Sequence, residues 1–123
     1  MPIKSRVLFV EDHEDTRQLV ALWLGMAGYE VETADGVAGA LELARDKSFD
    51  LYLLDSRFAD GTGKELCERL REFDEVTPIV FYSGETPEQL RKALECHAQN
   101  FVMKPELDAL PLVIASTIEA AKA

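Results

Sequence analysis

Five short apolar runs alternate with longer segments of helical periodicity along the chain. The runs cover residues 6–10, 30–33, 51–54, 79–82 and 101–103. The first, third and fourth are almost continuously apolar, which is typical of strands that are covered on both faces. The second and fifth mix polar with apolar positions, which favours places at or near the edges of a sheet.

The segments between the runs predict amphipathic helices. After the first run, one helical face is formed by Thr16, Leu19, Val20, Trp23 and Ala27. Near the end of the chain, a second such face is formed by Leu110, Val113, Ile114, Ile118 and Ala121. We expect Asp35 to cap the helix that follows the second run, and Asp108 to cap the last helix.

Two capping boxes support these helix boundaries. Thr62 is followed three residues later by Glu65, and Thr86 by Gln89, with Pro87 at the first helical position. The resulting order is (βα)₅, which predicts an α/β fold with a doubly wound parallel five-stranded sheet and right-handed crossovers. We expect residues 1–123 to form a single domain, with no segment left for a second, output domain.

The charge of the chain limits its partners. Asp and Glu outnumber Lys and Arg by 23 to 13, giving a formal net charge of −10. Such a surface disfavours direct binding to nucleic acid or to an anionic membrane. The first apolar run is too short for a signal peptide or a membrane span, so we expect a cytoplasmic protein. In that compartment, Cys67 and Cys96 are expected to be buried free thiols.

Polar side chains follow the predicted strands at the points where the strands end. Glu11 and Asp12 follow the first strand, Asp55 closes the third, Ser83 follows the fourth and Lys104 follows the fifth. If the strand order is 2-1-3-4-5, these ends are neighbours, and open α/β sheets place their sites at this edge. Each residue alone has an ordinary structural explanation, as a cap, turn or surface charge; their joint placement predicts a site.

The residue types at this edge indicate phosphoryl chemistry. Three close carboxylates repel one another unless a cation compensates, and oxygen ligands without His or Cys favour Mg²⁺. Mn²⁺ or Ca²⁺ could replace it in a crystal. Asp55, at the tip of a rigid strand, can attack phosphorus, while Lys104 and Ser83 can bind phosphoryl oxygens. His13 is expected to be a solvated loop residue and not a metal ligand.

Four motifs in order resemble the receiver domain of bacterial response regulators over nearly the whole chain. They are VLFVED (residues 7–12), DLYLLD (50–55), IVFYSG (79–84) and NFVMKP (100–105). The resemblance implies a flavodoxin-like, CheY-like three-layer sandwich. It further implies that Asp55 accepts a phosphoryl group, and that Glu11, Asp12 and Asp55 hold Mg²⁺ with the backbone carbonyl of Arg57.

The same resemblance implies a switch next to the phosphorylation site. Lys104 would contact the phosphate, and Pro105 would follow a cis peptide bond. Gly84 would leave room for the incoming group. Ser83 and Phe101 would form the switch pair, in which the hydroxyl moves toward the phosphate and the ring rotates inward. Simple core packing is the alternative explanation for Phe101.

The implied partners are proteins. The phosphoryl donor would be a phosphohistidine of a sensor histidine kinase or of a histidine phosphotransfer protein. The effector would bind the face formed by the fourth helix, fifth strand and fifth helix. The domain would assist its own phosphorylation and dephosphorylation and would not otherwise be an enzyme. The first helix is more apolar than core burial needs, because it contains Leu22, Trp23, Leu24 and Met26. This suggests a docking surface there, with ordinary packing and incidental exposure as the alternative.

The sequence argues against three other functions and leaves a fourth open. A flavodoxin-like electron carrier needs a phosphate-binding loop after the first strand, where this chain has acidic residues. A phosphatase with an Asp nucleophile places a second acid where Arg57 stands, and the Gly-Lys-Ser/Thr signature of a P-loop enzyme is absent. The open alternative is a pseudo-receiver, an interaction module on the same fold that is not phosphorylated.

One departure from the family pattern lies in the loop after Asp55. The family usually has a Met-Pro pair where this chain has Phe58 and Ala59. Loss of the proline frees a backbone dihedral, so we expect an altered or more mobile loop with phosphorylation retained. Arg57 and Glu85 have opposite charges and flank the predicted site, so we expect them to pair across its mouth.

Overall fold

The computed structural model describes residues 4–85, 88, 91 and 95–122. Its centre is a five-stranded sheet in the order β2-β1-β3-β6-β7, in which every neighbouring pair is parallel. The strands are β1 (Arg6–Val10), β2 (Glu30–Ala34), β3 (Leu51–Leu54), β6 (Ile79–Ser83) and β7 (Asn100–Met103). Since β6 and β7 are the predicted fourth and fifth strands, the predicted order 2-1-3-4-5 and the two edge strands are confirmed.

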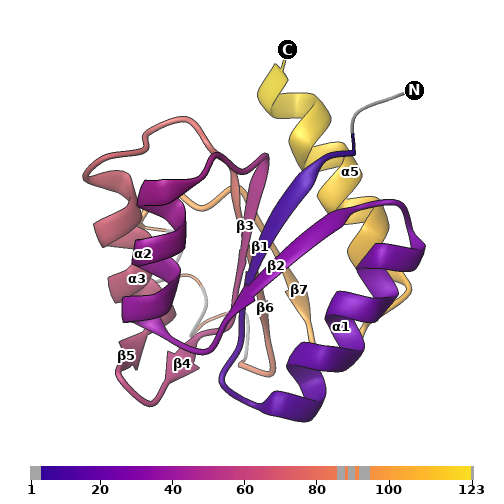
Figure 1. Cartoon of the computed structure of the whole chain (residues 1–123), viewed down its shortest axis with the longest axis horizontal. Coiled ribbons are helices and arrows are strands. Elements are labelled where there is room, and N and C mark those ends of the chain that lie inside the picture. Colours follow the sequence, from indigo (N-terminus) through magenta and orange to yellow (C-terminus); the bar gives the residue numbers. More distant parts are fainter. Residues whose placement is uncertain (1–3, 86–87, 89–90, 92–94, 123) are drawn as a thin grey trace.

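Helices cover both faces of this sheet. They are α1 (Glu14–Met26), α2 (Val37–Asp46), α3 (Gly63–Arg71) and α5 (Ala109–Lys122). Figure 1 shows α2 and α3 on one face and α1 and α5 on the other. The predicted helix that begins near Thr86, with its capping box and Pro87, falls largely outside the described residues. The three-layer arrangement is the one that the sequence predicts.

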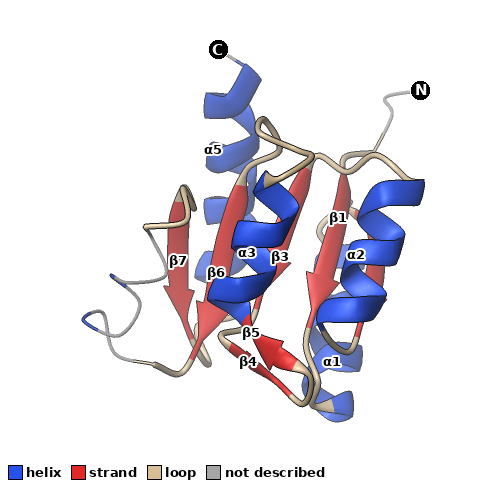
Figure 2. Ribbon diagram, turned by 90° about the vertical axis from the view of Figure 1, so that its left-hand side faces the viewer, coloured by secondary structure: helices blue, strands red, loops and turns tan. Residues whose placement is uncertain are grey.

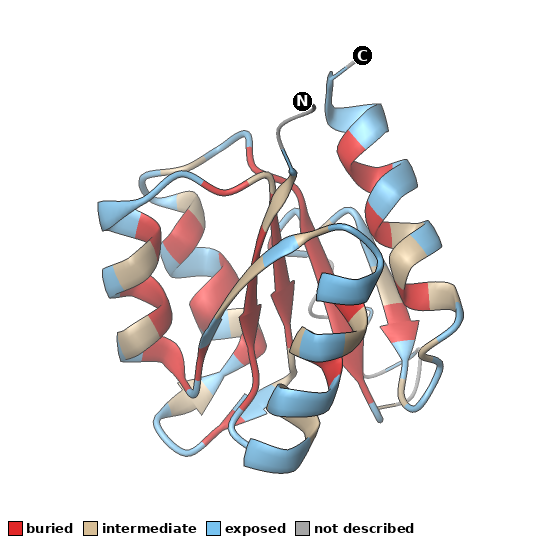
Figure 3. Cartoon of the chain, turned by 45° about the vertical axis from the view of Figure 1, so that its right-hand side comes forward, coloured by how far each residue is buried: buried red, intermediate tan, exposed pale blue. Residues whose placement is uncertain are grey.

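The central strands contribute to two separate cores because their side chains alternate between the faces. Leu8 and Val10 of β1 pack toward α2 and α3, whereas Val7 and Phe9 pack toward α1 and α5. All four are fully buried. The helices bury one side and expose the other, as Figure 3 shows. Continuous apolar runs in β1, β3 and β6 thus follow from burial on both faces.

Helix α1 is rotated relative to the predicted apolar face. Its buried residues are Val20 and Leu24, whereas Leu19, which we expected in the core, is 54% exposed. The Trp23 indole donates a hydrogen bond to the carbonyl of Leu107 at 2.8 Å. The apolar stripe of this helix is wider than the part that the sheet can cover. Periodicity alone therefore predicted burial of Leu19, whereas Leu24 is the buried leucine.

The N-terminus of α2 is capped from a distance. Its N-cap residue is Gly36 and not Asp35 as predicted. The carboxylate of Asp60 accepts hydrogen bonds from the amides of Val37 (2.8 Å) and Ala38 (3.0 Å). These amides hold the pKa of Asp60 below its usual value. The cap of α3 was predicted correctly: the Thr62 hydroxyl accepts a hydrogen bond from the Glu65 amide at 3.1 Å.

A small hairpin that sequence patterns did not predict follows β3. It consists of β4 (Arg57–Phe58) and β5 (Gly61–Thr62), paired antiparallel, and lies at the end of the sheet where β1 and β3 finish (Figure 2). Phe58 is buried in the core between the sheet and α2 and α3, and Asp60 is held by α2. These contacts argue against the mobility that we expected for this loop.

The two cysteines form a disulfide, which corrects the prediction of free thiols. Cys67 of α3 and Cys96, before β7, have Cα atoms 6.0 Å apart, and both are buried. The fold places α3 beside the segment that leads into β7, a proximity that a sequence separation of 29 residues does not reveal. Within the described residues, none of the helices has the length and apolar character needed to cross a membrane.

A buried tyrosine ties β3 to the turn before β6. The Tyr52 hydroxyl donates to the Asp74 carboxylate at 2.6 Å, and the amides of Val76 and Thr77 donate to the same carboxylate. Burial opposes ionisation of Asp74, but these hydrogen bonds outweigh it and keep its pKa below the usual value. A depressed carboxylate pKa stabilises the fold at neutral pH, and this stabilisation is lost as pH falls through the folded value.

We predict that Tyr52→Phe lowers the free energy of unfolding by about 2 kcal/mol at pH 7, the size expected for a hydrogen bond to a charged group. The difference from wild type should shrink as pH falls through the lowered pKa of Asp74, because the carboxylate then becomes protonated. Urea denaturation at several pH values measures both effects. Tyr29→Phe is the control, since the Tyr29 hydroxyl makes only a 3.4 Å contact; an equal loss there would contradict the assignment.

Candidate functional site

The predicted site residues meet at the carboxyl ends of the parallel strands. Glu11 directly follows β1, Asp55 follows β3, Ser83 ends β6 and Lys104 follows β7. The Lys104 ammonium lies 2.5 Å from Glu11 Oε1 and 3.2 Å from Asp55 Oδ2. Residues 93 positions apart in the sequence are therefore in direct contact. The convergence predicted from strand ends is confirmed for the side chains of Glu11, Asp55 and Lys104.

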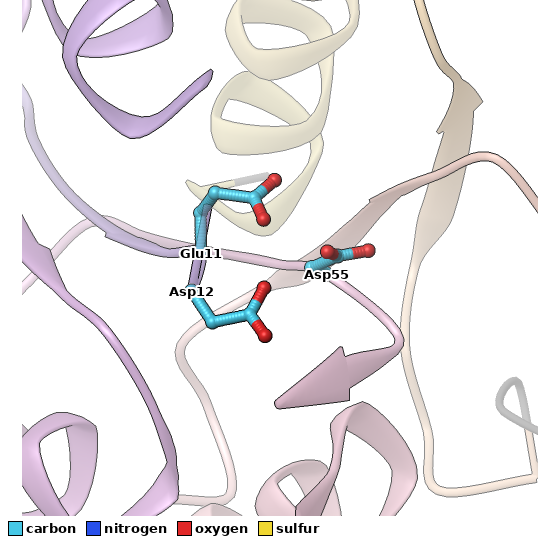
Figure 4. A group of neighbouring side chains, drawn as sticks. All are labelled: Glu11, Asp12 and Asp55. Atoms are coloured by element: carbon cyan, nitrogen blue, oxygen red, sulfur yellow. The ribbon is translucent and has the colours of Figure 1, made fainter. Parts of the chain in front are cut away.

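Three carboxylates form a cluster that could hold a metal ion. Glu11, Asp12 and Asp55 each offer an oxygen, and these oxygens lie within 4.8 Å of one another. Figure 4 shows Glu11 and Asp12 reaching from the segment after β1 toward the side where Asp55 lies. An all-oxygen donor set containing an exposed member, Asp12, suits Mg²⁺, which retains several waters when it binds to carboxylates. The residues present fit the predicted ion.

Charge compensation within the cluster is incomplete. Burial raises the pKa of Glu11 above its usual value; the hydrogen bond from Lys104 opposes this rise, and the nearby Asp55 carboxylate adds to it. Burial disfavours the ammonium of Lys104, yet its hydrogen bond to Glu11 and the charges of Asp55 and Glu11 keep its pKa above the usual value. One ammonium thus contacts two of the three clustered carboxylates, and the remaining negative charge favours the binding of a further cation.

Asp55 is held firmly by the backbone around it. Its amide donates to the carbonyl of Val10 at 3.1 Å, and the amide of Ser56 donates to its Oδ1 at 2.7 Å. A Cβ added to Gly63 would lie 2.2 Å from the Asp55 carbonyl oxygen, so α3 can begin this close to Asp55 only with glycine. The carboxylate remains 13% exposed, which leaves it accessible to a reactant.

Ser83 is buried at the end of β6, and its hydroxyl makes two hydrogen bonds among the described residues. It is 1% exposed. Its hydroxyl accepts from the amide of Glu85 at 3.1 Å and lies 2.7 Å from the hydroxyl of Ser56. Phe101 pairs with Phe81 across β6 and β7 and packs, partly buried, against the core that faces α2 and α3. Its proposed rotation stays a prediction.

The predicted ion pair between Arg57 and Glu85 is present, while its position across the mouth of the site stays a prediction. Arg57 Nε lies 3.0 Å from Glu85 Oε1, with the arginine 80% exposed and the glutamate 23% exposed. The role of the Arg57 carbonyl as a metal ligand stays a prediction. At Gly84, an added Cβ would meet no described atom within 4 Å, which is consistent with the open space expected there.

Two further predictions concern the neighbours of the site. The peptide bond between Lys104 and Pro105 is cis, as predicted. His13 is exposed and serves as the N-cap of α1, where its Nδ1 accepts a hydrogen bond from the amide of Thr16. It is thus a helix cap, and it does not belong to the carboxylate cluster.

Sequence reasoning did not single out Ser56 or identify the cap made by Asp60. Ser56 could have been noticed because it directly follows the predicted nucleophile. Asp60 had no local signal, because the amides that it binds lie more than twenty residues away on α2.

Comparison with known proteins points to one family. Residues 7–115 match the response regulator receiver domain. The phosphate regulon transcriptional regulatory protein PhoB of Pseudomonas aeruginosa is 34% identical over 84% of this chain and 46% of its own length. The sensor histidine kinase RcsC of Salmonella typhi is 31% identical over 89% of this chain and 12% of its own.

Solved structures show the same likeness at full length. The chemotaxis protein CheY4 of Vibrio cholerae has 31% sequence identity and a TM-score of 0.88, covering 94% of this chain and 99% of that one. By contrast, the chain spans less than half the length of the regulators and kinases it matches, for example 25% of the regulatory protein AtoC of Escherichia coli.

Proposed function

The chain belongs to the response regulator receiver domain family, and we propose that it accepts a phosphoryl group on Asp55 in a Mg²⁺-dependent reaction and thereby changes the surface it offers to a partner. The observation that carries this proposal is the contact of Lys104 with both Glu11 and Asp55, next to a cluster of carboxylate oxygens. A pseudo-receiver would not need to keep these groups together.

The residues of the site divide the chemistry among them. A carboxylate oxygen of Asp55 forms the new bond to phosphorus while the bond from phosphorus to the histidine nitrogen of the donor breaks. Lys104, already beside Asp55, binds a phosphoryl oxygen and balances part of its charge. Glu11 and Asp12 would hold Mg²⁺ with Asp55, helped by the Arg57 carbonyl; the ion, when bound, neutralises charge on the transferred group.

The conformational response begins at Ser83. Its hydroxyl lies at the end of β6 and can donate its single proton to a phosphoryl oxygen on Asp55 only if it donates to no other acceptor. Phe101, opposite Phe81 on the neighbouring strand, would turn into the space that Ser83 leaves. A phosphoryl group can shift this equilibrium only by as much as it binds the two conformations differently.

We further propose that the partners are proteins of the cytoplasm. A sensor histidine kinase or a histidine phosphotransfer protein supplies the phosphoryl group, and an effector reads the face that contains β7 and α5. The domain assists its own phosphorylation and acts on no other substrate. The support for this is its match to receiver regions both in transcriptional regulators and in a sensor kinase.

The central prediction is that the protein binds beryllium fluoride, a phosphoryl analogue, at Asp55 only when Mg²⁺ is present. Calorimetry should show binding by the wild type and by Asp46→Ala, an exposed acid at the end of α2. It should show none by Asp55→Ala, provided that circular dichroism confirms the fold of that variant. Absence of binding by the folded wild type would favour a pseudo-receiver.

A second prediction concerns the ion pair of Arg57 and Glu85. Because Arg57 and Glu85 each stand two residues after a site residue, Asp55 and Ser83, we expect their ion pair to hinder the approach of water to the acyl phosphate. Arg57→Ala should therefore hydrolyse its phosphoryl group up to about fivefold faster, the limit set by an exposed ion pair of roughly 1 kcal/mol. The decay of protein labelled with ³²P measures the rate, with Lys64→Ala as the matched control. A decay no faster than that of the parent would refute the role.

A third prediction concerns the exposed apolar face of α1, where Leu19, Leu22 and Met26 are 54%, 63% and 75% exposed. If a phosphohistidine donor protein docks there, Leu22→Glu should slow transfer from that protein about tenfold, the usual cost of losing an interface contact. Phosphorylation by acetyl phosphate, which needs no docking, should not change. Leu112→Glu is the control, since Leu112 is 73% exposed on α5. Equal rates from both donors would remove the docking hypothesis.

A further inference from the structure

Ser56 joins the phosphorylation site to the switch residue. Its backbone amide donates to Asp55 Oδ1 at 2.7 Å, and its carbonyl accepts from the amide of Gly63 at 2.8 Å. The close approach of α3 adds to this restraint, because an added Cβ at Gly63 would lie 3.0 Å from the Ser56 Cα. The backbone of Ser56 is therefore fixed on both sides, so its side chain extends from a fixed position.

The free part of Ser56 is its hydroxyl, which lies 2.7 Å from the hydroxyl of Ser83. Either oxygen could donate, and burial indicates which one does. Ser83 is 1% exposed, so water does not accept its proton, and the amide of Glu85 already donates to its oxygen. Ser56 is partly exposed and can donate its own proton to solvent. With Ser83 as the donor and Ser56 as the acceptor, the buried hydroxyl keeps its proton paired, as buried hydroxyls usually do.

We propose that Ser56 is a positioning residue that holds Ser83 in the unphosphorylated conformation and competes with the phosphoryl group for the single hydroxyl proton of Ser83. This proposal rests on the proposed function of Asp55 and adds a restraint to it. A hydroxyl has one proton, so a Ser83 that donates to a phosphoryl oxygen no longer donates to Ser56. The hydrogen bond in which Ser83 donates to Ser56 therefore exists in one state of the switch only.

An interaction made in one state only biases the equilibrium toward that state. Without the Ser56 hydroxyl, the Ser83 proton loses its acceptor in the unphosphorylated conformation, and this conformation becomes less favourable. A ligand that binds the other conformation then binds more tightly, because a larger fraction of the protein is in the conformation that it binds. Its affinity rises by the factor by which the unphosphorylated conformation is disfavoured. For one net hydrogen bond, this factor is about threefold to tenfold.

The test measures binding of beryllium fluoride with Mg²⁺ by calorimetry in a double-mutant cycle of Ser56→Ala and Ser83→Ala. We expect Ser56→Ala to bind about threefold to tenfold more tightly than wild type, and Ser56→Thr, which keeps a hydroxyl, to bind as the wild type does. In the Ser83→Ala background, Ser56→Ala should change nothing, because the bond is already absent. Ser116→Ala, an exposed serine of α5, is the control with unchanged affinity.

The outcomes separate this proposal from the one on which it rests. If the wild type binds no beryllium fluoride, the proposed function itself fails. If the wild type binds and Ser56→Ala binds equally, Ser56 is no restraint. Weaker binding by Ser56→Ala would mean that Ser56 orients Ser83 for the phosphoryl group, and this too would overturn the proposal. A tighter affinity that persists in the Ser83→Ala background would assign the effect to something other than this hydrogen bond.

Discussion

The contact of Lys104 with Glu11 and Asp55 is the constraint on which the site depends. It places one ammonium against two carboxylates of a cluster of three, and one of these, Glu11, is almost fully buried. A buried acid without a partner would be costly, so the lysine stabilises the folded cluster while leaving net negative charge. That residual charge attracts a divalent cation, and the lysine stays within reach of any phosphoryl group that Asp55 accepts. Structural and chemical demands are met by the same pair of contacts.

This arrangement follows from the order of the strands. β1 lies between β2 and β3, so the chain crosses to opposite faces of the sheet from neighbouring strands, and α1 and α3 diverge from their ends. The space between them receives Asp12 and Asp55 from adjacent strands without any long loop. A site built at such a crossover is positioned by the hydrogen bonds of the sheet and not by flexible segments. The buried cores on both faces hold those strand ends in register.

Much of this geometry could be predicted from the sequence because it depends on local signals. Continuous apolar runs locate the central strands, and polar residues at their ends locate Glu11, Asp55, Ser83 and Lys104. What could not be predicted depends on contacts between distant segments. The cap that Asp60 provides for α2, the disulfide of Cys67 and Cys96 and the rotation of α1 away from Leu19 all require tertiary packing. Sequence periodicity contains no information about which part of a wide apolar stripe the sheet will cover.

The segment after Asp55 shows how rigidity and switching can coexist in a small site. Phe58 in the core, Asp60 on α2 and the close packing of Gly63 fix the backbone of this segment. In the switch that we propose, movement is then left to side chains, chiefly the hydroxyl of Ser83 and the ring of Phe101. A proton that can be donated to only one acceptor gives such a system two distinct states, since intermediate positions satisfy neither acceptor. Because the position of Ser56 is fixed, the Ser83 hydroxyl would occupy one of these two states and no intermediate position.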